Sequence, residues 1–204
     1  MRINGVKRIF LVALAACFVL LFAMFGRRSV DGEMAIEREY PRNNTALVLI
    51  REKDSVIRIE GEGKLYANDL KAMLKTAGIH SSDIKNVIVG EGISEIGYRT
   101  FYRFKSLETL KLGSHVVRVA PGALNYCASL KWLYLPSGAS QIGEGFLYGC
   151  EQCRVVTDAR SGDVPSLENV EPEHIITEVD SFDGLRSAMD DGADLPDVLA
   201  RWWR

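Results

Sequence analysis

The 204-residue sequence has none of the short motifs that many enzymes share. It contains no GxSxG nucleophile motif, no HExxH zinc motif and no glycine loop of the kind that cradles phosphate. No Cys–His pair and no pair of carboxylates can be brought together from their spacing. Catalytic groups need not be close in sequence, but these absences favour a chain that is not an enzyme and needs no cofactor.

Potential metal ligands are also few, with four cysteines and three histidines. Cys150 and Cys153 form a lone CxxC, and no second CxxC accompanies it. The histidines, which show no ligand spacing, are His80, His115 and His174. An acidic cluster at 190–197 lacks the D-x-D-x-D-G order of a calcium loop. We therefore predict no metal site.

The charge is close to balanced, with a formal net charge of −2, but it is unevenly distributed. Residues 1–30 contain five basic side chains and no acidic one, whereas residues 154–204 contain 5 basic and 12 acidic side chains. No basic run occurs between them, which argues against a nucleic-acid-binding surface. We predict that residues 158–204 form an acidic C-terminal segment.

A 23-residue repeat is the most informative feature that is present. The residues that open successive units, each 23 positions from the next, are Ile84, Leu107, Leu130 and Cys153. The complete units are 84–106, 107–129 and 130–152, and a partial fourth unit extends the repeats to 157. A fixed period of this length predicts a stacked array, in which each unit buries its apolar side against its neighbours.

Apolar residues recur in register within these units. The fourth position holds Val87, Leu110, Leu133 and Val156, and the sixth holds Val89, Leu112 and Leu135. This spacing of two predicts a short strand with both positions facing inward. Three later columns are Ile96, Val119 and Ile142, then Gly97, Ala120 and Gly143, then Phe101, Leu124 and Leu147. They predict a second extended piece, a tight corner with close backbone approach, and a helical turn.

These columns resemble the bacterial surface-antigen type of leucine-rich repeat, called BspA-like. That family carries a strand ending in Pro or Gly, then an "IG..AF.GC..L" stretch, and the matching stretches begin at Ile96, Val119 and Ile142. Phe104 stands where the family usually has Cys, and Ala120 where it has Gly. The resemblance covers about 84–156. It implies a leucine-rich-repeat solenoid, dominated by β-strands with short helical turns, that is usually displayed outside a bacterial cell for adhesion or recognition.

An apolar segment precedes the repeats. Ile9–Phe25 holds 17 residues without charge between basic flanks, which is near the lower limit for a transmembrane helix. We predict that residues 1–28 are a signal-anchor with one membrane span and the repeats outside, followed by a charged stalk at 29–44. A cleaved, secreted form and a lipoprotein cleaved before Cys17 are the alternatives that remain open.

The N-terminal end of the array needs a cover, because an open sheet edge invites aggregation. Residues 45–83 are predicted to supply it as a hairpin, Ala46–Ile50 with Ser55–Glu60, and a short helix, Asp69–Thr76. The residues expected to start and end this helix are Asn68 and Gly78.

The C-terminal segment lacks the repeat columns. Ile175–Val179 predicts one last strand, and Asp194 begins a predicted terminal helix that carries Trp202 and Trp203. We predict that this helix folds back as a cap over the last rung. The alternative is an exposed tail in which the two tryptophans anchor a partner.

A binding face follows from the strand alternation. If the fourth and sixth positions of each unit point inward, the third and fifth point outward. These outward residues are Asn86, Ile88, Thr109, Lys111, Trp132 and Tyr134. Large aromatic side chains such as Trp132 and Tyr134 are common in recognition surfaces. The alternative is that the C-terminal segment packs over them.

Two cysteines share one repeat column. Cys127 and Cys150 are predicted to lie on adjacent rungs about 5 Å apart, a spacing compatible with a disulfide. The other interpretation makes both of them small core-facing residues, with Cys153 in place of the column leucine.

Two functions of different classes fit these features. The first is a non-enzymatic, membrane-tethered module for recognition or adhesion at the cell surface, with an unidentified protein or other ligand as its partner. The second is a structural spacer or assembly element, in which the acidic tail or the membrane anchor makes the contacts.

Overall fold

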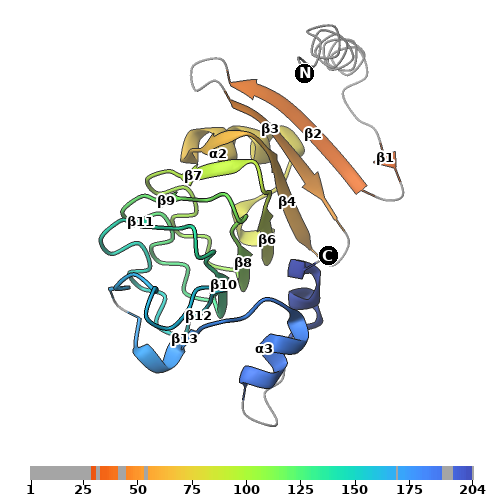
Figure 1. Ribbon diagram of the computed structural model, residues 1–204. Coiled ribbons are helices and arrows are strands. Elements are labelled where there is room, and N and C mark those ends of the chain that lie inside the picture. The colour runs from red at the N-terminus through yellow and green to blue at the C-terminus, as the bar shows by residue number, and fades with distance from the viewer. Residues whose placement is uncertain are drawn as a thin grey trace, which may run out of the picture.

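The computed structural model describes residues 29–30, 33–40, 45–52, 55–168, 170–189 and 195–203. The predicted membrane segment at 9–25 lies outside these residues. Within the described part of the chain, no helix combines the length and the apolar character needed to cross a bilayer. The repeats wind as successive rungs with a hairpin and a helix at one end and the C-terminal segment beside the other (Figure 1).

A nine-stranded sheet runs along the array in the order β1-β2-β3-β4-β6-β8-β10-β12-β13. Neighbours from β1 to β4 pair antiparallel, and those from β4 onward pair parallel. The strands are β1 Ser29–Val30, β2 Glu33–Tyr40, β3 Thr45–Arg51, β4 Val56–Gly61, β6 Asn86–Val89, β8 Thr109–Lys111, β10 Trp132–Tyr134, β12 Arg154–Val156 and β13 Ile175–Ile176.

A second, four-stranded sheet contains the second extended piece of each unit, in the order β11-β9-β7-β5. Its strands are β5 Gly63–Leu65, β7 Ile93–Ile96, β9 Arg118–Val119 and β11 Gln141–Ile142. Ile96 pairs with Val119, and Val119 with Ile142, as the column predicted. The two sheets therefore enclose the interior from two sides.

The 23-residue register holds across three rungs and then changes. Leu110 pairs with both Val87 and Leu133, each 23 positions away. Leu133, however, pairs with Val155 and not with Val156. The last rung is thus one residue shorter, so Val155 joins the main core while Val156 lies in a separate cluster. The predicted inward position of Val156 was wrong.

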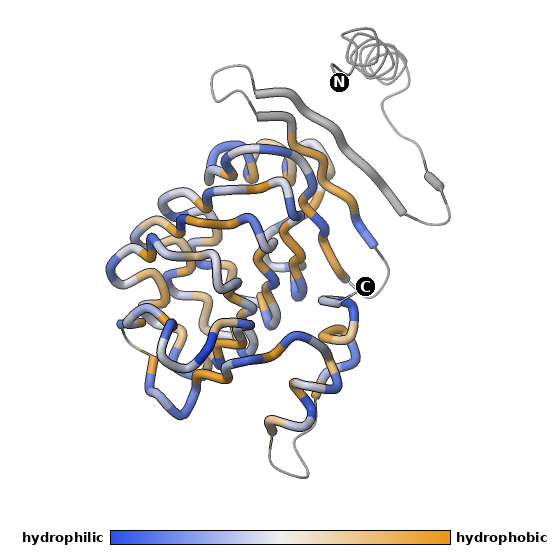
Figure 2. The backbone as a smooth tube through the Cα atoms, viewed as in Figure 1, coloured by the Kyte–Doolittle hydropathy of each residue, from blue (hydrophilic) through white to orange (hydrophobic). Residues whose placement is uncertain are grey.

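The main core lies between the two sheets. Val87, Leu110 and Leu133 are at most 1% exposed, so the predicted inner column is dry. Figure 2 shows hydrophobic residues recurring along successive strands, with hydrophilic residues in the connections between them. Truncating one such leucine to alanine costs about 2–5 kcal/mol in typical cores.

Close backbone approach occurs at the corners, as predicted. A Cβ on Gly97 would lie 2.3 Å from Tyr66 Cδ1, and one on Gly143 would lie 2.2 Å from the nitrogen of Pro121. Only a residue without a Cβ fits these two places, which explains glycine in the first and third units, whereas the second unit has Ala120.

The predicted N-terminal cover is present. Strands β3 and β4 form the hairpin, and β4 pairs with the first rung. Helix α2, Ala67–Ala77, ends at Gly78, whose φ of 68° is left-handed. Its N-cap is Tyr66 and makes no side-chain hydrogen bond, so the predicted capping by Asn68 was wrong. A 3₁₀ turn, η1 (Ser81–Asp83), leads into the first rung.

The segment 29–44 differs from the predicted stalk, because β1 and β2 lie within it. Glu33–Tyr40 alternates apolar and acidic residues over much of its length, which is a strand pattern. Its backbone pairs with β3 over seven residue pairs, which supplies the partners that a stalk would lack.

The C-terminal segment folds back on the array. It contains η2 Pro172–His174, α3 Phe182–Ala188 and η3 Asp197–Trp203 in addition to β13. The terminal helix predicted from Asp194 is thus a 3₁₀ helix that starts at Asp197, and the predicted strand Ile175–Val179 is confined to Ile175–Ile176. Helix α3, which was not predicted, is capped by the Ser181 hydroxyl, which accepts a hydrogen bond from the Gly184 amide.

Candidate functional site

The six residues of the predicted binding face lie together on one side of the repeat strands. Asn86 pairs with Thr109 and Thr109 with Trp132, while Lys111 pairs with both Ile88 and Tyr134. They form two parallel rows across β6, β8 and β10. The six residues therefore share one surface of the sheet, as the strand alternation predicted.

That face is not an open surface, because the C-terminal segment covers it. Four of the six residues are buried: Ile88, Thr109, Trp132 and Tyr134. Their apolar neighbours in one cluster include Leu185 of α3 and Leu199 and Trp202 of η3. The Tyr134 ring lies 5.9 Å from the rings of both Trp202 and Trp203. Figure 1 shows this end of the chain beside β4.

Polar groups on the covered face are satisfied within the chain. The Thr109 hydroxyl donates to Asn86 Oδ1 at 2.9 Å, and Lys111 Nζ lies 3.2 Å from Glu91 Oε1. Burial raises the pKa of the Tyr134 hydroxyl above its usual range. Arg201 also fastens the segment to the N-terminal hairpin, 3.5 Å from Glu52. The prediction of a ligand face here is corrected to an internal packing face.

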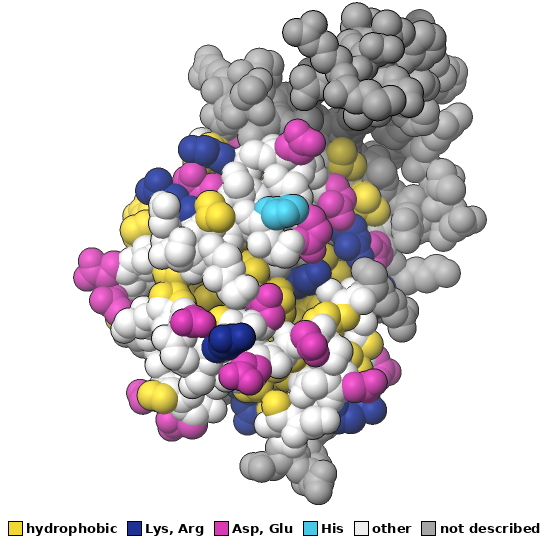
Figure 3. Space-filling model, viewed as in Figure 1, with side chains coloured by type: hydrophobic (Ala, Val, Ile, Leu, Met, Phe, Trp, Pro, Cys, Tyr) yellow, Lys and Arg dark blue, Asp and Glu magenta, His cyan; other side chains and the backbone are white. Residues whose placement is uncertain are grey.

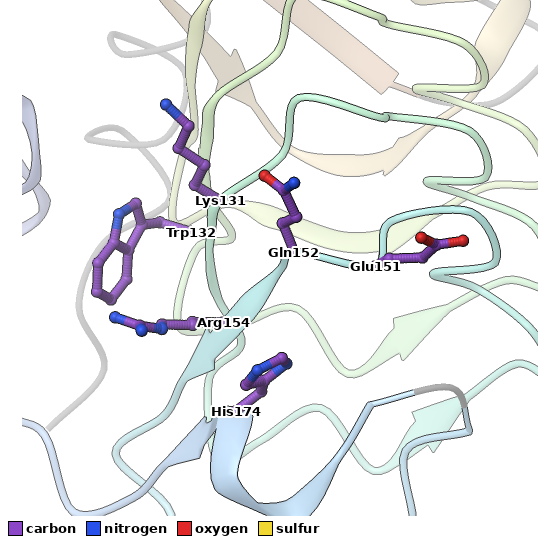
Figure 4. A pocket seen from close by; sticks show the side chains of 6 residues that line it. All are labelled: Lys131, Trp132, Glu151, Gln152, Arg154 and His174. Atoms are coloured by element: carbon purple, nitrogen blue, oxygen red, sulfur yellow. The ribbon is translucent and has the colours of Figure 1, made fainter.

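A hollow of about 440 Å³ opens at the edge of the strands near the last rung. Its lining residues are Lys131, Trp132, Glu151, Gln152, Arg154 and His174. The Arg154 guanidinium lies 5.5 Å from the Trp132 ring, and Figure 4 shows the two side chains next to one another. Lys131 already pairs with Glu108 at 3.8 Å, so only part of this basic character is available to a ligand.

The cysteines of the repeats are buried thiols. Cys127, Cys150 and Cys153 form no disulfide, which corrects the possible Cys127–Cys150 bridge. Cys127 Sγ donates to the carbonyl of Phe101 at 3.0 Å, and Cys150 Sγ to that of Leu124 at 3.1 Å. The neighbouring Cys150 thiol and burial raise the pKa of Cys127, and burial raises that of Cys153. The described residues contain no cluster of three or more His, Cys, Asp or Glu placed to hold a metal ion.

A second surface, which was not predicted from the sequence, lies on the helical turns that follow the small-residue corners. We call it the tyrosine–arginine surface, and its residues are Tyr98, Arg99, Tyr102, Arg103, Tyr126 and Tyr148. Tyr98, Tyr126 and Tyr148 are 56%, 43% and 52% exposed, and they are three of the four exposed large hydrophobic residues of the described chain. An aromatic row this open on a packed scaffold is a candidate for recognition.

Ring contacts join the tyrosines across three rungs. Tyr102 packs edge-to-face on Tyr126 at 5.8 Å, and Tyr126 on Tyr148 at 5.4 Å. This geometry suits the charge distribution of aromatic rings. The tyrosines therefore form one continuous row.

Two arginines lie between the rings at one end of the row. The Arg99 guanidinium is 4.9 Å from the ring centres of both Tyr98 and Tyr102. The Arg103 guanidinium is 5.1 Å from Tyr102 and 5.8 Å from Tyr126. These are cation–π contacts, which hold each long side chain against a ring.

The backbone beneath this surface is left-handed at two columns of the repeat. The first column is Arg99, Gly122 and Gly145, with φ of 55°, 65° and 59°. The second is Arg103, Tyr126 and Gly149, with φ of 60°, 61° and 76°. Glycine adopts this conformation without strain, whereas other residues pay about 1–2 kcal/mol for it.

Gly149 makes room for a tyrosine of the rung before, because a Cβ there would lie 2.9 Å from Tyr126 Cδ1. A Cβ on Gly122 would lie 3.3 Å from Asn125 Nδ2 and only in ordinary contact with Tyr98 Cε2, at 3.5 Å. The tyrosines were visible in the sequence, but only Tyr102 and Tyr148 share a repeat column. The signal that could have located them is the period-23 recurrence of glycine beside them.

Charge does not gather into one field on the side of the molecule in Figure 3. Acidic and basic side chains are interspersed there, with hydrophobic side chains visible between them. This side of the molecule therefore presents no extended field of one charge sign.

Comparison with known proteins identifies the repeats. Residues 76–161 match a family model described as "BspA type Leucine rich repeat region (6 copies)". A leucine-rich repeat protein from Eubacterium ventriosum ATCC 27560 has a similar structure, with 17% sequence identity and a TM-score of 0.38; the match covers 60% of this chain and 44% of that one. The chain thus spans less than half of that protein. No curated protein matches the chain. The repeats at residues 76–161 are therefore similar to BspA-type leucine-rich repeats.

Proposed function

We propose that this chain is a non-enzymatic recognition module that binds a partner protein through the tyrosine–arginine surface. The observation that carries the proposal is the continuous, exposed row of Tyr and Arg side chains across three rungs. Leucine-rich repeat proteins commonly serve protein interaction and are generally not enzymes, which agrees with the family match at 76–161.

The chemistry of the surface suits protein binding. Tyr and Arg are enriched among the residues that contribute most to interface affinity. Tyrosine offers a large contact area with little side-chain freedom to lose. Because the turns are fixed by a buried core, ordering this surface on binding costs little further entropy.

We also propose that residues 9–25 tether the module to a membrane with the repeats outside the cell. The support is the uncharged 17-residue run with basic flanks and the surface location typical of BspA-type repeats. Protease added to intact cells is expected to cleave the repeats, and lysis is expected to add no further cleavage. If the repeats were cleaved only after lysis, they would lie on the inner side of the membrane, which would contradict this orientation.

Binding through the proposed surface is tested with the full chain in detergent, applied to an array of bacterial and host surface proteins. Tyr126→Ser and Tyr148→Ser are the test variants. Val117→Ser is the matched control, because Val117 is 45% exposed but lies outside the row. We expect the two test variants to lower affinity for the captured protein by about tenfold or more, equal to about 1.4 kcal/mol, with the control unchanged. Equal binding by all variants would contradict the proposal.

The same experiment separates recognition from the spacer function. A spacer that contacts its neighbours only through its acidic tail or its anchor has no need of the tyrosines. Any binding of such a spacer to the surface proteins would be abolished by neutralising the acidic tail. Substitution of Tyr126 or Tyr148 would not change that binding.

A further inference from the structure

We propose that the partner presents carboxylates to Arg99 and Arg103, so that the surface binds an extended acidic segment of a protein. The inference rests on the proposed function and makes it more specific. It assigns the arginines to the acidic side chains of the segment, and the exposed rings of Tyr126 and Tyr148 to its apolar side chains.

The first support is that these two cations are not neutralised. Within the described part of the chain, neither Arg99 nor Arg103 forms an ion pair. Other cations of the repeats are paired, for example Lys85 and Lys131 with Glu108 at 3.3 and 3.8 Å. Two adjacent uncompensated guanidiniums attract an anionic ligand.

The second support is the way in which the arginines are held. Contacts with the rings of Tyr98, Tyr102 and Tyr126 restrain both side chains. A cation–π contact occupies none of the N–H donors of the guanidinium. These donors therefore remain available to a carboxylate of a ligand. Arginine held in advance in this way can bind a carboxylate with two parallel hydrogen bonds at a smaller entropic cost.

The third support is the backbone. Both arginines occupy left-handed positions where the third unit has Gly145 and Gly149. Each non-glycine residue there costs about 1–2 kcal/mol. The left-handed turn recurs in all three units, so the fold sets this conformation, and arginine in place of glycine adds strain of the kind that concentrates at functional positions.

The fourth support is a change of charge along the row. The turn of the first unit carries Arg99, Arg103 and Lys105, whereas the equivalent turn of the third unit carries Glu144 and Glu151. Two rungs of about 4.8 Å each separate these turns. Acidic side chains of the segment are therefore attracted to the first unit and repelled from the third, which places the acidic part of the segment over the first unit.

The basic hollow near the last rung is a less suitable carboxylate site. Lys131 is paired with Glu108, and Glu151 lines the hollow. It nevertheless provides a useful internal comparison, because Arg154 belongs to the hollow and not to the tyrosine–arginine surface.

The test uses the full chain in detergent and fluorescence anisotropy of a labelled synthetic peptide of alternating Glu and Phe. The same peptide with Gln or Lys in place of Glu is the matched ligand control. The test variant is Arg99→Gly with Arg103→Gly, which should fold normally because glycine occupies the same columns in the third unit. Arg154→Gln and the exposed Arg160→Gln are the control variants.

We expect the Glu peptide to bind more tightly than the Gln and Lys peptides. The glycine double substitution should lower the affinity for the Glu peptide by about tenfold or more, equal to about 1.4 kcal/mol. The control substitutions should lower this affinity by less than about twofold. Added salt should weaken binding as well, because the attraction is between exposed charges.

Three results would overturn the acidic-partner proposal. The first is that the Glu peptide binds no better than its Gln version. The second is that Arg154→Gln abolishes binding while the glycine double variant retains it, and the third is that dextran sulfate binds where the Glu peptide does not, which would indicate an anionic polysaccharide as the partner. If the array partner is lost with Tyr126→Ser but kept with the glycine variant, recognition by the surface stands and only its acidic partner is wrong.

Discussion

Single residues of the repeat turns hold the tyrosine row in place. Gly145 and Gly149 both have left-handed backbones, but their surroundings differ. A Cβ on Gly145 meets nothing within 4 Å, whereas one on Gly149 would press on the Tyr126 ring at 2.9 Å. A side chain at Gly145 would therefore add backbone strain alone, whereas one at Gly149 would also displace the Tyr126 ring.

Substituting these glycines gives the first stability prediction. Gly145→Ala is expected to lower the free energy of unfolding by about 1 kcal/mol through backbone strain alone. Gly149→Ala is expected to cost more, because the Tyr126 ring must also move. Urea unfolding of both variants checks the order, and an equal loss would mean that the ring contact has no energetic weight.

The buried thiols make the stability of the folded chain depend on pH. Burial raises the pKa of Cys153 in the folded state, so the thiolate forms more readily in the unfolded chain. The stabilising effect is complete below the unfolded pKa of about 8.5 and is lost as pH rises above it. Under reducing conditions, the urea midpoint is expected to fall between about pH 8 and pH 10, and Cys153→Ala should flatten that fall. An unchanged slope in the variant would contradict this assignment.

At the scale of elements, the C-terminal segment acts as the cover of the strand face. Leu199 and Trp202 of η3 are at most 1% exposed and pack with Trp132 and Tyr134. The indole Nε1 of Trp202 has no hydrogen-bond partner among the described residues. The contribution of this tryptophan to stability is therefore one of packing.

Two substitutions at Trp202 test the packing role. Trp202→Ala is expected to lower the free energy of unfolding by about 3–5 kcal/mol, the usual range for a large buried aromatic residue. Trp202→Phe should cost much less, because it keeps an aromatic ring and removes a buried donor. Chemical denaturation followed by circular dichroism measures both. Equal losses would show that the aromatic ring retained in phenylalanine contributes nothing, which would contradict the packing role.

Elements of the repeat and the N-terminal hairpin and helix were predictable, whereas the register change and helix α3 were not. The inner column of Val87, Leu110 and Leu133 follows from period and spacing. The one-residue shortening before β12 does not, because Val155 and Val156 are both valines and either can face inward. Helix α3 was missed because its seven residues are too few to show a clear helical period.

At the scale of the whole molecule, stability depends on contacts between successive rungs. Leu133 lies between Leu110 and Val155 and is fully buried. Each rung contacts mainly its neighbours, so a defect in the middle weakens both interfaces. The sheet edge before the first rung is closed by β4.

Leu133→Ala therefore tests the array as a whole. It is expected to destabilise the chain by about 2–5 kcal/mol, whereas Lys71→Ala on the exposed face of α2 should change the free energy of unfolding by less than about 0.5 kcal/mol. Thermal and urea unfolding provide the measurement. A small effect at Leu133 would mean that the rungs do not depend on one another.

The sequence placed the candidate site on the wrong side of the array, for a physical reason. Alternation along a strand tells which residues share a face, and Trp132 and Tyr134 do share one. It does not tell what covers that face, because the covering residues Leu199 and Trp202 lie in a segment without repeats. The tyrosine row lies on turns, where neither a helical nor a strand period marks exposed side chains.

Tyrosine nitration with tetranitromethane, read by mass spectrometry with and without the Glu–Phe peptide, tests the central claim most directly. The account predicts that Tyr98, Tyr126 and Tyr148 are modified in the unbound chain and protected on binding, while buried Tyr134 is unreactive in both states. Modification of Tyr134 in the unbound chain, with protection only there on binding, would contradict the account and return recognition to the strand face.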